Sequence, residues 1–158
     1  MAVEWTAVII KQEGVRRGIE DRVALELEAL GLRLVICSSK VRIPDRDGQL
    51  LYSGLAGRPW RIKAICAIIS APVICMIFEE EDAIQTVRSW LGPTNVDKAF
   101  ADEGCFRGRM LRQFGFMKEP YRSAGNYVHA SGNLDEARTD IDVCLKYCKV
   151  QCIVWLAR

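Results

Sequence analysis

The chain has 158 residues, of which 50% are hydrophobic and 27% are charged, and these values are typical of one globular domain spanning residues 1–158. Its 22 Lys and Arg residues against 20 Asp and Glu residues leave a formal charge of +2, too little for a protein that coats nucleic acid. No apolar run approaches the roughly 20 residues of a membrane-spanning helix, and the first residues lack the pattern of a secretion signal. We therefore expect a cytoplasmic protein.

The first third of the chain alternates apolar runs with polar breaks. β-Branched and aromatic residues predict a strand at 5–10, which the polar sequence Gln12-Glu13-Gly14 ends. Asp21, as an N-cap, and Gly31, as a stop, delimit a predicted helix. The apolar run 32–37 predicts a second strand.

The next segment is irregular before the pattern returns. Pro44 and several charges make 42–57 irregular or short helical, whereas 58–71 has the length and pattern of a helix. The unbroken apolar run 73–78 is typical of a strand that is buried on both faces.

The second half begins with four consecutive acids, 79–82, which favour the N-terminus of a helix at 83–91. Periodicity is weak over 94–125. A short strand at 127–130 and an amphipathic helix at 134–147 follow. This order predicts an α+β fold, a ferredoxin-like split βαβ sandwich in which helices cover an antiparallel sheet.

The seven cysteines are odd in number and form no Cys-x-x-Cys pair, which argues against a disulfide scaffold. Cys144, Cys148 and Cys152 recur every fourth residue and would share one face of a helix. Three thiolates could hold a metal ion, but zinc usually takes four ligands, and the single histidine lies elsewhere in the sequence. We favour buried, reduced thiols over a metal site.

His129 is the single histidine, and it lies near the end of the short strand predicted at 127–130, among small and polar neighbours. One interpretation is a structural histidine that makes one hydrogen bond. The other is a catalytic histidine at the end of a strand, with Ser131 and a later acid to orient it. His129 alone does not decide between them.

Basic residues gather before His129, and each could be a solvated surface charge or a phosphate ligand. The glycines of Gly104-Cys105-Phe106-Arg107-Gly108 would let the backbone approach a ligand while presenting one guanidinium. The sequence has neither a Walker loop nor a dinucleotide fingerprint, so side chains would have to hold a bound phosphate. The basic residues of this part of the chain are Arg107, Arg109, Arg112, Lys118 and Arg122.

Six segments carry a more specific pattern. They are 11–15 (Lys-Gln-Glu-Gly-Val), 58–61 (Arg-Pro-Trp-Arg), 71–73 (Ala-Pro-Val), 88–95 (Arg-Ser-Trp-Leu-Gly-Pro-Thr-Asn), 104–108 (Gly-Cys-Phe-Arg-Gly) and 126–132 (Asn-Tyr-Val-His-Ala-Ser-Gly). In order and spacing they resemble motifs of the nucleoside diphosphate kinase family, and the similarity runs from about Trp5 to Ile141. Among those motifs are the family's Lys-Pro-Asp-Gly-Val, Gly-Thr-Ile-Arg-Gly and Asn-x-x-His-Gly-Ser-Asp.

The resemblance implies a ping-pong reaction. His129 would take the γ-phosphate of a nucleoside triphosphate such as ATP as phosphohistidine and pass it to a nucleoside diphosphate. Asp140, where the family has Glu, and Ser131 would orient His129. The residues implied in nucleotide binding are Lys11, Tyr52, Trp60 (stacked on the base), Arg88, Thr94, Arg107 and Asn126.

The resemblance also implies partners. Mg²⁺ would arrive with the nucleotide rather than at a metal site of the protein, and the chain would form a homo-oligomer, with the hexamer usual in the family. The nucleoside tri- and diphosphates would be the ligands, and no membrane would be involved.

Departures from the family pattern surround the histidine. Ala130 replaces Gly, which would cost roughly 1 kcal/mol if the position required a positive φ. Gly132 and Asn133 replace an acid and a small residue, which predicts a weakly capped final helix, and Asp140 is one methylene shorter than Glu. The segment between Arg107 and Asn126 is longer than usual.

The longer segment contains aromatic residues, which we expect either to pack on a neighbouring subunit or to lie over the nucleotide. We expect the apolar stretch 150–156 to pack on this subunit or another one.

Two alternative functions stay open. One is a catalytically weak module of the same fold that binds a nucleotide or a protein partner. The other is a nucleic-acid-binding domain that uses the basic residues from Arg107 to Arg122, which the near-neutral total charge disfavours.

Overall fold

The computed structural model describes residues 2–118, 122 and 126–148. Within these residues the elements are, in chain order, β1 (Glu4–Ile10), α1 (Gln12–Arg17), α2 (Glu20–Ala29), β2 (Arg33–Cys37), α3 (Asp45–Leu51), the 3₁₀ turn η1 (Ser53–Leu55), α4 (Arg61–Ile69), β3 (Ile74–Glu80), α5 (Ala83–Leu91), α6 (Val96–Ala101), α7 (Phe106–Phe114), β4 (Val128–Ala130) and α8 (Leu134–Tyr147).

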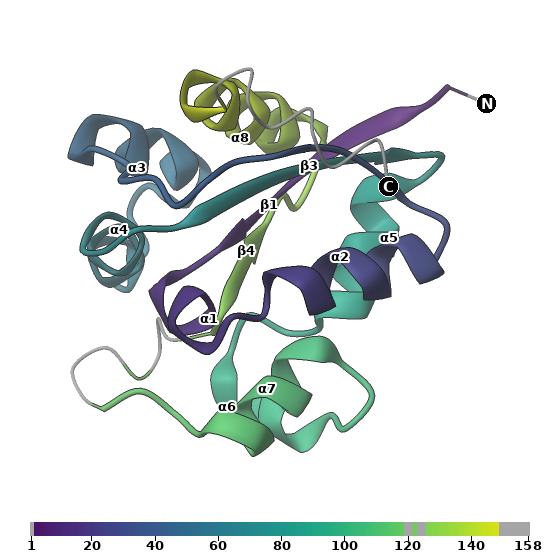
Figure 1. Cartoon of the computed structure of the whole chain (residues 1–158). Helices are drawn as coiled ribbons and strands as arrows, with labels where there is room; N and C mark the ends of the chain where they lie inside the picture. Colours follow the sequence, from purple (N-terminus) through teal and green to yellow (C-terminus); the bar gives the residue numbers. More distant parts are fainter. Residues whose placement is uncertain (1, 119–121, 123–125, 149–158) are drawn as a thin grey trace.

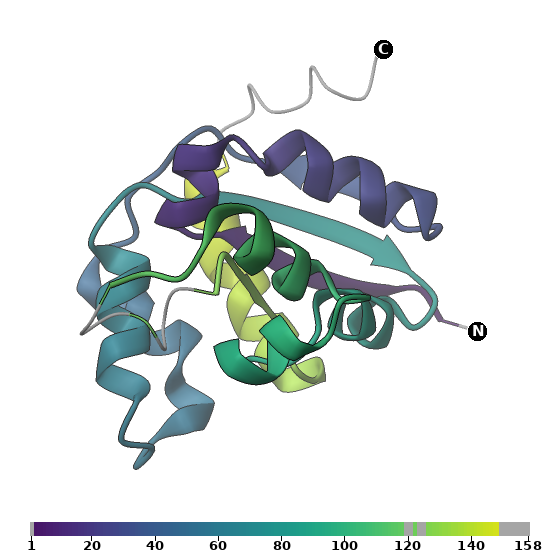
Figure 2. The same ribbon diagram turned by 90° about the horizontal axis from the view of Figure 1, so that it is seen from below.

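The four strands form one sheet in the order β2-β3-β1-β4, and every neighbouring pair is antiparallel. Helices cover both faces of this sheet (Figures 1 and 2): α2, α5 and α7 pack on one face, and α3, α4 and α8 pack on the other. The predicted α+β architecture with an antiparallel sheet is confirmed.

The two central strands separate two hydrophobic cores because successive side chains of a strand point to opposite faces. Val8 and Ile10 of β1 belong to the core beneath α2 and α5, whereas Ala7 and Ile9 belong to the core beneath α3, α4 and α8. β3 alternates in the same way and is buried from Ile74 to Phe78, as its unbroken apolar run predicted.

Several predicted boundaries were wrong. α2 begins at Glu20, so Asp21 lies in the first helical turn and is not the N-cap. α4 spans Arg61–Ile69 rather than 58–71. Of the four acids predicted to precede α5, Glu79 and Glu80 belong to β3 instead.

The polar sequence Gln12-Glu13-Gly14, expected to be a break after the first strand, instead begins the short helix α1 (Gln12–Arg17). A Cβ atom on Gly14 would lie 2.6 Å from Ile10 Cγ2, closer than side-chain contacts allow. Gly14 therefore lets α1 pack tightly on the end of β1 and does not mark a break in structure.

The expectation of a weak cap on α8 was also wrong. Asn133 Oδ1 accepts a hydrogen bond from the backbone N–H of Glu136 at 2.9 Å, and Glu136 Oε2 accepts one from the N–H of Gly132 at 2.7 Å. Together they form a variant of the capping box, in which Glu136 bonds to the residue before the N-cap Asn133. Ala130 lies in β4 without a positive φ, and the left-handed conformation nearby belongs to Tyr127, at φ 66°.

Some predictions lie outside the described residues, among them the packing of 150–156 and the placement of Cys152. Cys144 is buried and Cys148 is half-buried. Among the described residues, no helix is long and apolar enough to cross a membrane.

Candidate active site

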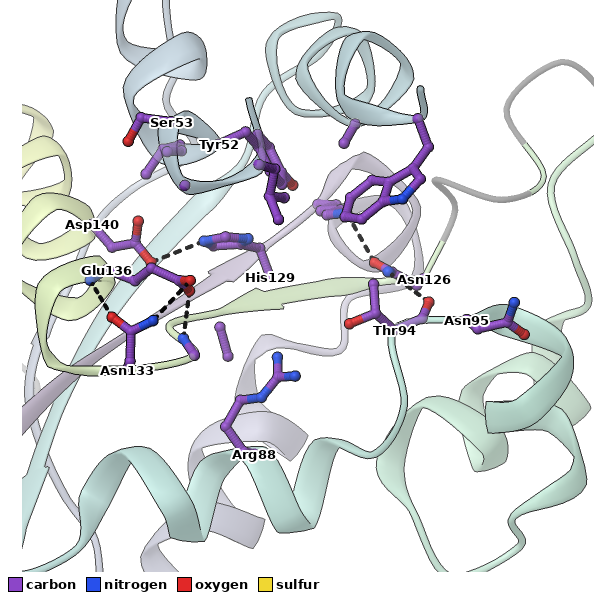
Figure 3. A pocket seen from close by; sticks show the side chains of 18 of the residues that line it. Tyr52, Ser53, Arg88, Thr94, Asn95, Asn126, His129, Asn133, Glu136 and Asp140 are labelled. Atoms are coloured by element: carbon purple, nitrogen blue, oxygen red, sulfur yellow. Dashed lines mark hydrogen bonds and ion pairs between the residues drawn. The ribbon is translucent and has the colours of Figure 1, made fainter. Parts of the chain in front are cut away.

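A cavity of about 800 Å³ lies beside the edge strand β4 (Figure 3). Tyr52 and Ser53 come from the α3–α4 side, whereas Arg88, Thr94 and Asn95 come from the opposite wall, formed by α5 and the start of α6. Nine of the ten predicted site residues line this cavity: Lys11, Tyr52, Trp60, Arg88, Thr94, Arg107, Asn126, His129 and Asp140. The tenth, Ser131, is buried and bonded to Asp140.

The alternation of strand β4 places His129 at the cavity. His129 pairs with Ile9 of β1, so its side chain points to the face that α3, α4 and α8 cover, while Val128 and Ala130 point into the other core. His129 is 8% exposed, which means that a ligand must enter the cavity to reach it.

Asp140 and Ser131 fix the imidazole ring of His129. His129 Nε2 lies 3.0 Å from Asp140 Oδ2, and Ser131 Oγ donates a hydrogen bond of 2.9 Å to the same oxygen. A carboxylate only accepts hydrogen bonds, so Nε2 carries the proton and the lone pair of the neutral ring is on Nδ1. Asp140, although shorter than Glu, therefore reaches the histidine.

Tyr52 stands over the ring of His129. The two ring centroids are 5.1 Å apart in an edge-to-face arrangement, and the Tyr52 hydroxyl is buried without a hydrogen-bond partner among the described residues. Burial, with Asp140 nearby, raises the pKa of Tyr52, so its hydroxyl stays a neutral donor. An anion beside His129 would give this hydroxyl an acceptor.

Lys11 follows β1 directly and is buried next to the cavity. Its Nζ donates a hydrogen bond of 2.8 Å to Asn126 Oδ1, and Asn126 Nδ2 donates one of 3.3 Å to the carbonyl of Thr94. Burial lowers the pKa of Lys11, Glu13 opposes this shift and Arg107 adds to it, and the net pKa is about 8. A bound phosphate would stabilise the protonated amine.

Arg107 is 2% exposed and joins three segments of backbone. Its guanidinium donates to the carbonyl oxygens of Gly92 (2.8 Å), Asn126 (3.3 Å) and Val128 (2.8 Å). Burial and, to a lesser extent, the nearby Arg88 together lower the pKa of Arg107 to about 9. The guanidinium both lines the cavity and holds β4 against the loop after α5.

The prediction that the glycines around Arg107 admit a ligand was wrong at Gly108. Arg107 and Gly108 lie in the first turn of α7, and a Cβ atom on Gly108 would lie 2.1 Å from the carbonyl oxygen of Asp102 and 2.3 Å from that of Ala99. Gly108 is therefore required by the close approach of the end of α6.

A buried acid that the sequence did not predict lies near Lys11, although it does not line the cavity. Glu13 is 5% exposed, and neither of its carboxylate oxygens has a hydrogen-bond partner among the described residues. Burial raises the pKa of Glu13, while Lys11 opposes this shift. The polar sequence Gln12-Glu13-Gly14 predicted the end of a strand, and only the tight packing of α1 buries Glu13.

The structure adds polar side chains at both ends of the cavity. Asn133 and Glu136 of the capping box line it on the side of Asp140, and Asp97 and Arg122 line it on the side of α6. The Asn-x-x-Glu spacing could have identified the first pair as a cap. Within the described ranges, no three His, Cys, Asp or Glu side chains gather as a metal site.

Comparisons with known proteins agree with this geometry. The family model described as nucleoside diphosphate kinase matches residues 4–150. The nucleoside diphosphate kinase of Staphylothermus marinus is 33% identical over 146 residues, which cover 92% of this chain and 95% of that protein. The enzyme of Sulfurisphaera tokodaii is 30% identical over 146 residues, which cover 92% and 91%.

Solved structures share the fold. A nucleoside diphosphate kinase from Halobacterium salinarum, in complex with CDP, covers 99% of this chain and 100% of its own, with a TM-score of 0.73 and 25% identity. The Aquifex aeolicus nucleoside diphosphate kinase covers 90% of this chain and 94% of its own, with a TM-score of 0.76 and 23% identity.

Proposed function

The chain belongs to the nucleoside diphosphate kinase family and is a nucleoside diphosphate kinase, and we propose that it works through a phosphohistidine on His129. The γ-phosphate of a nucleoside triphosphate such as ATP passes first to His129 and then to a nucleoside diphosphate. The observation that carries this proposal is the 3.0 Å contact of His129 Nε2 with Asp140, at a cavity lined by cationic side chains.

In the first half-reaction, the lone pair of His129 Nδ1 attacks the γ-phosphorus. The bond from phosphorus to the β–γ bridging oxygen breaks, and the nucleoside diphosphate leaves with the electron pair. The ring becomes positively charged, and Asp140 stabilises it by accepting the hydrogen bond from Nε2–H. Ser131 holds the accepting oxygen in place.

In the second half-reaction, a terminal phosphate oxygen of the acceptor diphosphate attacks the phosphorus on His129. The electron pair of the N–P bond returns to Nδ1, and the neutral imidazole is restored. One site serves both half-reactions in turn, so we expect ping-pong kinetics.

The cations of the cavity neutralise the phosphate charge that is redistributed during transfer. Lys11, Arg88 and Arg107 supply this positive charge, and Arg88 points into the cavity from α5 (Figure 3). Tyr52 and Thr94 supply hydroxyl donors, while Asn126 orients the Lys11 amine. Mg²⁺ enters with the nucleotide as part of the substrate.

Trp60 provides a surface for the nucleobase. It is 40% exposed at the start of α4 and lines the cavity. Stacking on an indole depends little on the identity of the base, because every base has a flat aromatic face. We therefore expect the enzyme to accept several nucleobases.

We also propose that the chain is a cytoplasmic homo-oligomer, with a hexamer as the expected form. Leu25 of α2 and Leu30, which directly follows this helix, are 67% and 51% exposed, and β2 is an edge strand of the sheet. A subunit interface would cover these apolar side chains. Light scattering coupled to size-exclusion chromatography measures the number of subunits.

The test of the mechanism is phosphate labelling. Purified protein is incubated with γ-labelled ATP and Mg²⁺ beside two variants, His129→Ala and the exposed control Asp142→Asn. We expect acid-labile, alkali-stable label on the wild type and the control but none on His129→Ala, and GDP should discharge the label as GTP.

A different result would support the weak module. If the wild type takes no label and yet binds ATP in calorimetry, the proposed reaction is refuted. The chain would then be a nucleotide-binding module with the fold of the family.

A further inference from the structure

The longer segment between α7 and Asn126 contributes a side chain to the cavity. Arg122 lines the cavity together with Asn95, Val96 and Asp97, which belong to the start of α6. The contacts of Arg122 with neighbouring side chains, and the end of the cavity at which it lies, indicate which part of the substrate it meets.

The guanidinium of Arg122 is held in a defined place. Nη2 lies 2.6 Å from Asp97 Oδ1 and Nη1 lies 3.2 Å from Asp97 Oδ2, a two-pronged ion pair. Cζ lies 4.4 Å from the centroid of the Phe116 ring, which in turn packs on Phe100 at 5.2 Å. These two contacts place the guanidinium beside the start of α6, where its side chain is still 36% exposed and open to a ligand.

The start of α6 borders the end of the cavity that is remote from the reacting phosphate. In Figure 3, Asp140 and His129 lie toward one end, and Asn95 lies beyond Thr94 at the other end. Since the γ-phosphate must reach His129, the nucleoside part of the substrate extends toward Asn95. Trp60, from the α4 wall, lines the same cavity.

The charge of the Arg122–Asp97 pair also favours a nucleoside over a phosphate. The carboxylate of Asp97 balances the guanidinium, so the pair adds no net positive charge to the cavity. Its remaining attractions are local ones, such as contact with a flat aromatic ring or with base acceptor atoms.

Building on the proposed function, we propose that Arg122 is a specificity-determining residue whose guanidinium contacts the nucleobase from the wall opposite Trp60. Purines present a larger aromatic surface and the acceptor atom N7, so this contact favours purine over pyrimidine nucleotides. Asp97 and Phe116 position the guanidinium for it.

The test compares binding of ligands with and without a base. Calorimetry measures the affinities of ADP, GDP, CDP and inorganic tripolyphosphate for the wild type and for Arg122→Ala. We expect Arg122→Ala to weaken ADP and GDP by about 5- to 30-fold and CDP by less, since cation–π contacts have this strength. Tripolyphosphate should bind unchanged, and kcat at saturating substrate should stay within about twofold of the wild type.

Arg112→Ala is the matched control. Arg112 also lies over a phenylalanine, at 5.1 Å from the Phe100 centroid, and pairs with an acid, Glu103, at 3.1 Å, but it does not line the cavity. Its substitution should leave all four affinities unchanged. Asp97→Asn keeps Arg122 but removes its charged partner, and we expect it to weaken ADP and GDP binding by less than Arg122→Ala does. This variant tests the same contact if Arg122→Ala does not fold.

Two results would overturn the inference. Unchanged nucleotide affinities in Arg122→Ala would mean that the guanidinium does not contact the base, and an equal loss for tripolyphosphate would assign it to the phosphates. Failure of the proposed function is separate, because it would appear as a wild type that binds nucleotides without forming phosphohistidine.

Discussion

Replacing Asp140 by Asn tests the proposed mechanism most directly. The change keeps the size of a side chain that is 1% exposed but removes the charge from an oxygen that accepts from His129 and Ser131. A hydrogen bond to a charged group contributes about 1.5–3 kcal/mol, against about 0.5–1.5 kcal/mol for a neutral pair. With two such bonds weakened, transfer should lose about 2–3 kcal/mol of transition-state stabilisation, which is roughly a 30- to 150-fold lower rate.

Rapid-quench measurement of a single turnover isolates this step. It follows the appearance of phosphate on His129 after mixing with saturating ATP, while calorimetry checks that ATP affinity stays within about threefold. Ser131→Ala removes one donor from the same Asp140 oxygen but leaves the carboxylate charge beside His129, so only part of that hydrogen bond, about 0.5–1.5 kcal/mol or 2- to 13-fold in rate, should be lost. The exposed Asp142→Asn, in the same helix, should have no effect.

A wild-type rate in Asp140→Asn would refute the reasoning, because His129 would then need no carboxylate to carry the positive charge. A loss of ATP affinity without a loss of rate would also refute it. Asp140 would then be a binding residue and not a positioning residue for the nucleophile.

Three further predictions concern charge and packing. Because a phosphate favours the protonated form of Lys11, whose pKa is about 8, ADP affinity measured by calorimetry should fall as the pH rises from 7 to 9.5; a similar fall in Lys11→Met would contradict this assignment. Glu26, hydrogen-bonded to Arg109, has a pKa lowered to about 2, so its stabilisation is fully present above pH 4.5 and is lost as the pH falls toward 2. The pKa difference corresponds to about 3 kcal/mol, which we reduce to about 2 kcal/mol for a side chain that is 26% exposed. In urea unfolding, Glu26→Gln should lower the free energy of unfolding by about 2 kcal/mol at pH 7 and by nearly nothing at pH 2. Equal losses at both pH values would argue against an ion pair. Gly108→Ala places a Cβ against two carbonyl oxygens and should lower the Tm by about 4–12 °C in a thermal melt, whereas Gly104→Ala, whose nearest neighbour is 3.4 Å away, should leave it within about 2 °C.

The parts of the fold that the sequence predicted correctly are those where one signal dominates. The apolar side chains of β3 are buried only if both faces of the strand are covered, which identifies it as a central strand. α8 is long and has a clear helical period. α1, α6 and α7 were missed because they are short or carry glycines and buried charges, such as Arg107, that disturb the pattern. Only tertiary packing makes these residues helical.

Some residues of the site could likewise be predicted from the sequence, and others could not. Side chains such as His129 and Lys11 could be named because they stand in motifs, and the structure brings them to one cavity. Arg122 was named only as one of several basic residues that could be surface charges or phosphate ligands, since its pairing with Asp97 joins positions that are distant in sequence. Glu13 was missed because its burial depends on how α1 packs.

The hydrogen bonds of Arg107 have a consequence for how the enzyme can vary in evolution. Arg107 stands at the start of the longer segment and bonds to the carbonyls of Asn126 and Val128 at its end, so the closing points of this loop are fixed by one side chain. The entropy cost of closing a loop grows slowly, by about 0.6 kcal/mol for each doubling of its length. Insertions after the end of α7 at Phe114 and before Asn126 therefore cost little stability and leave His129 in place. New contacts with the substrate can be acquired there without changing strand β4.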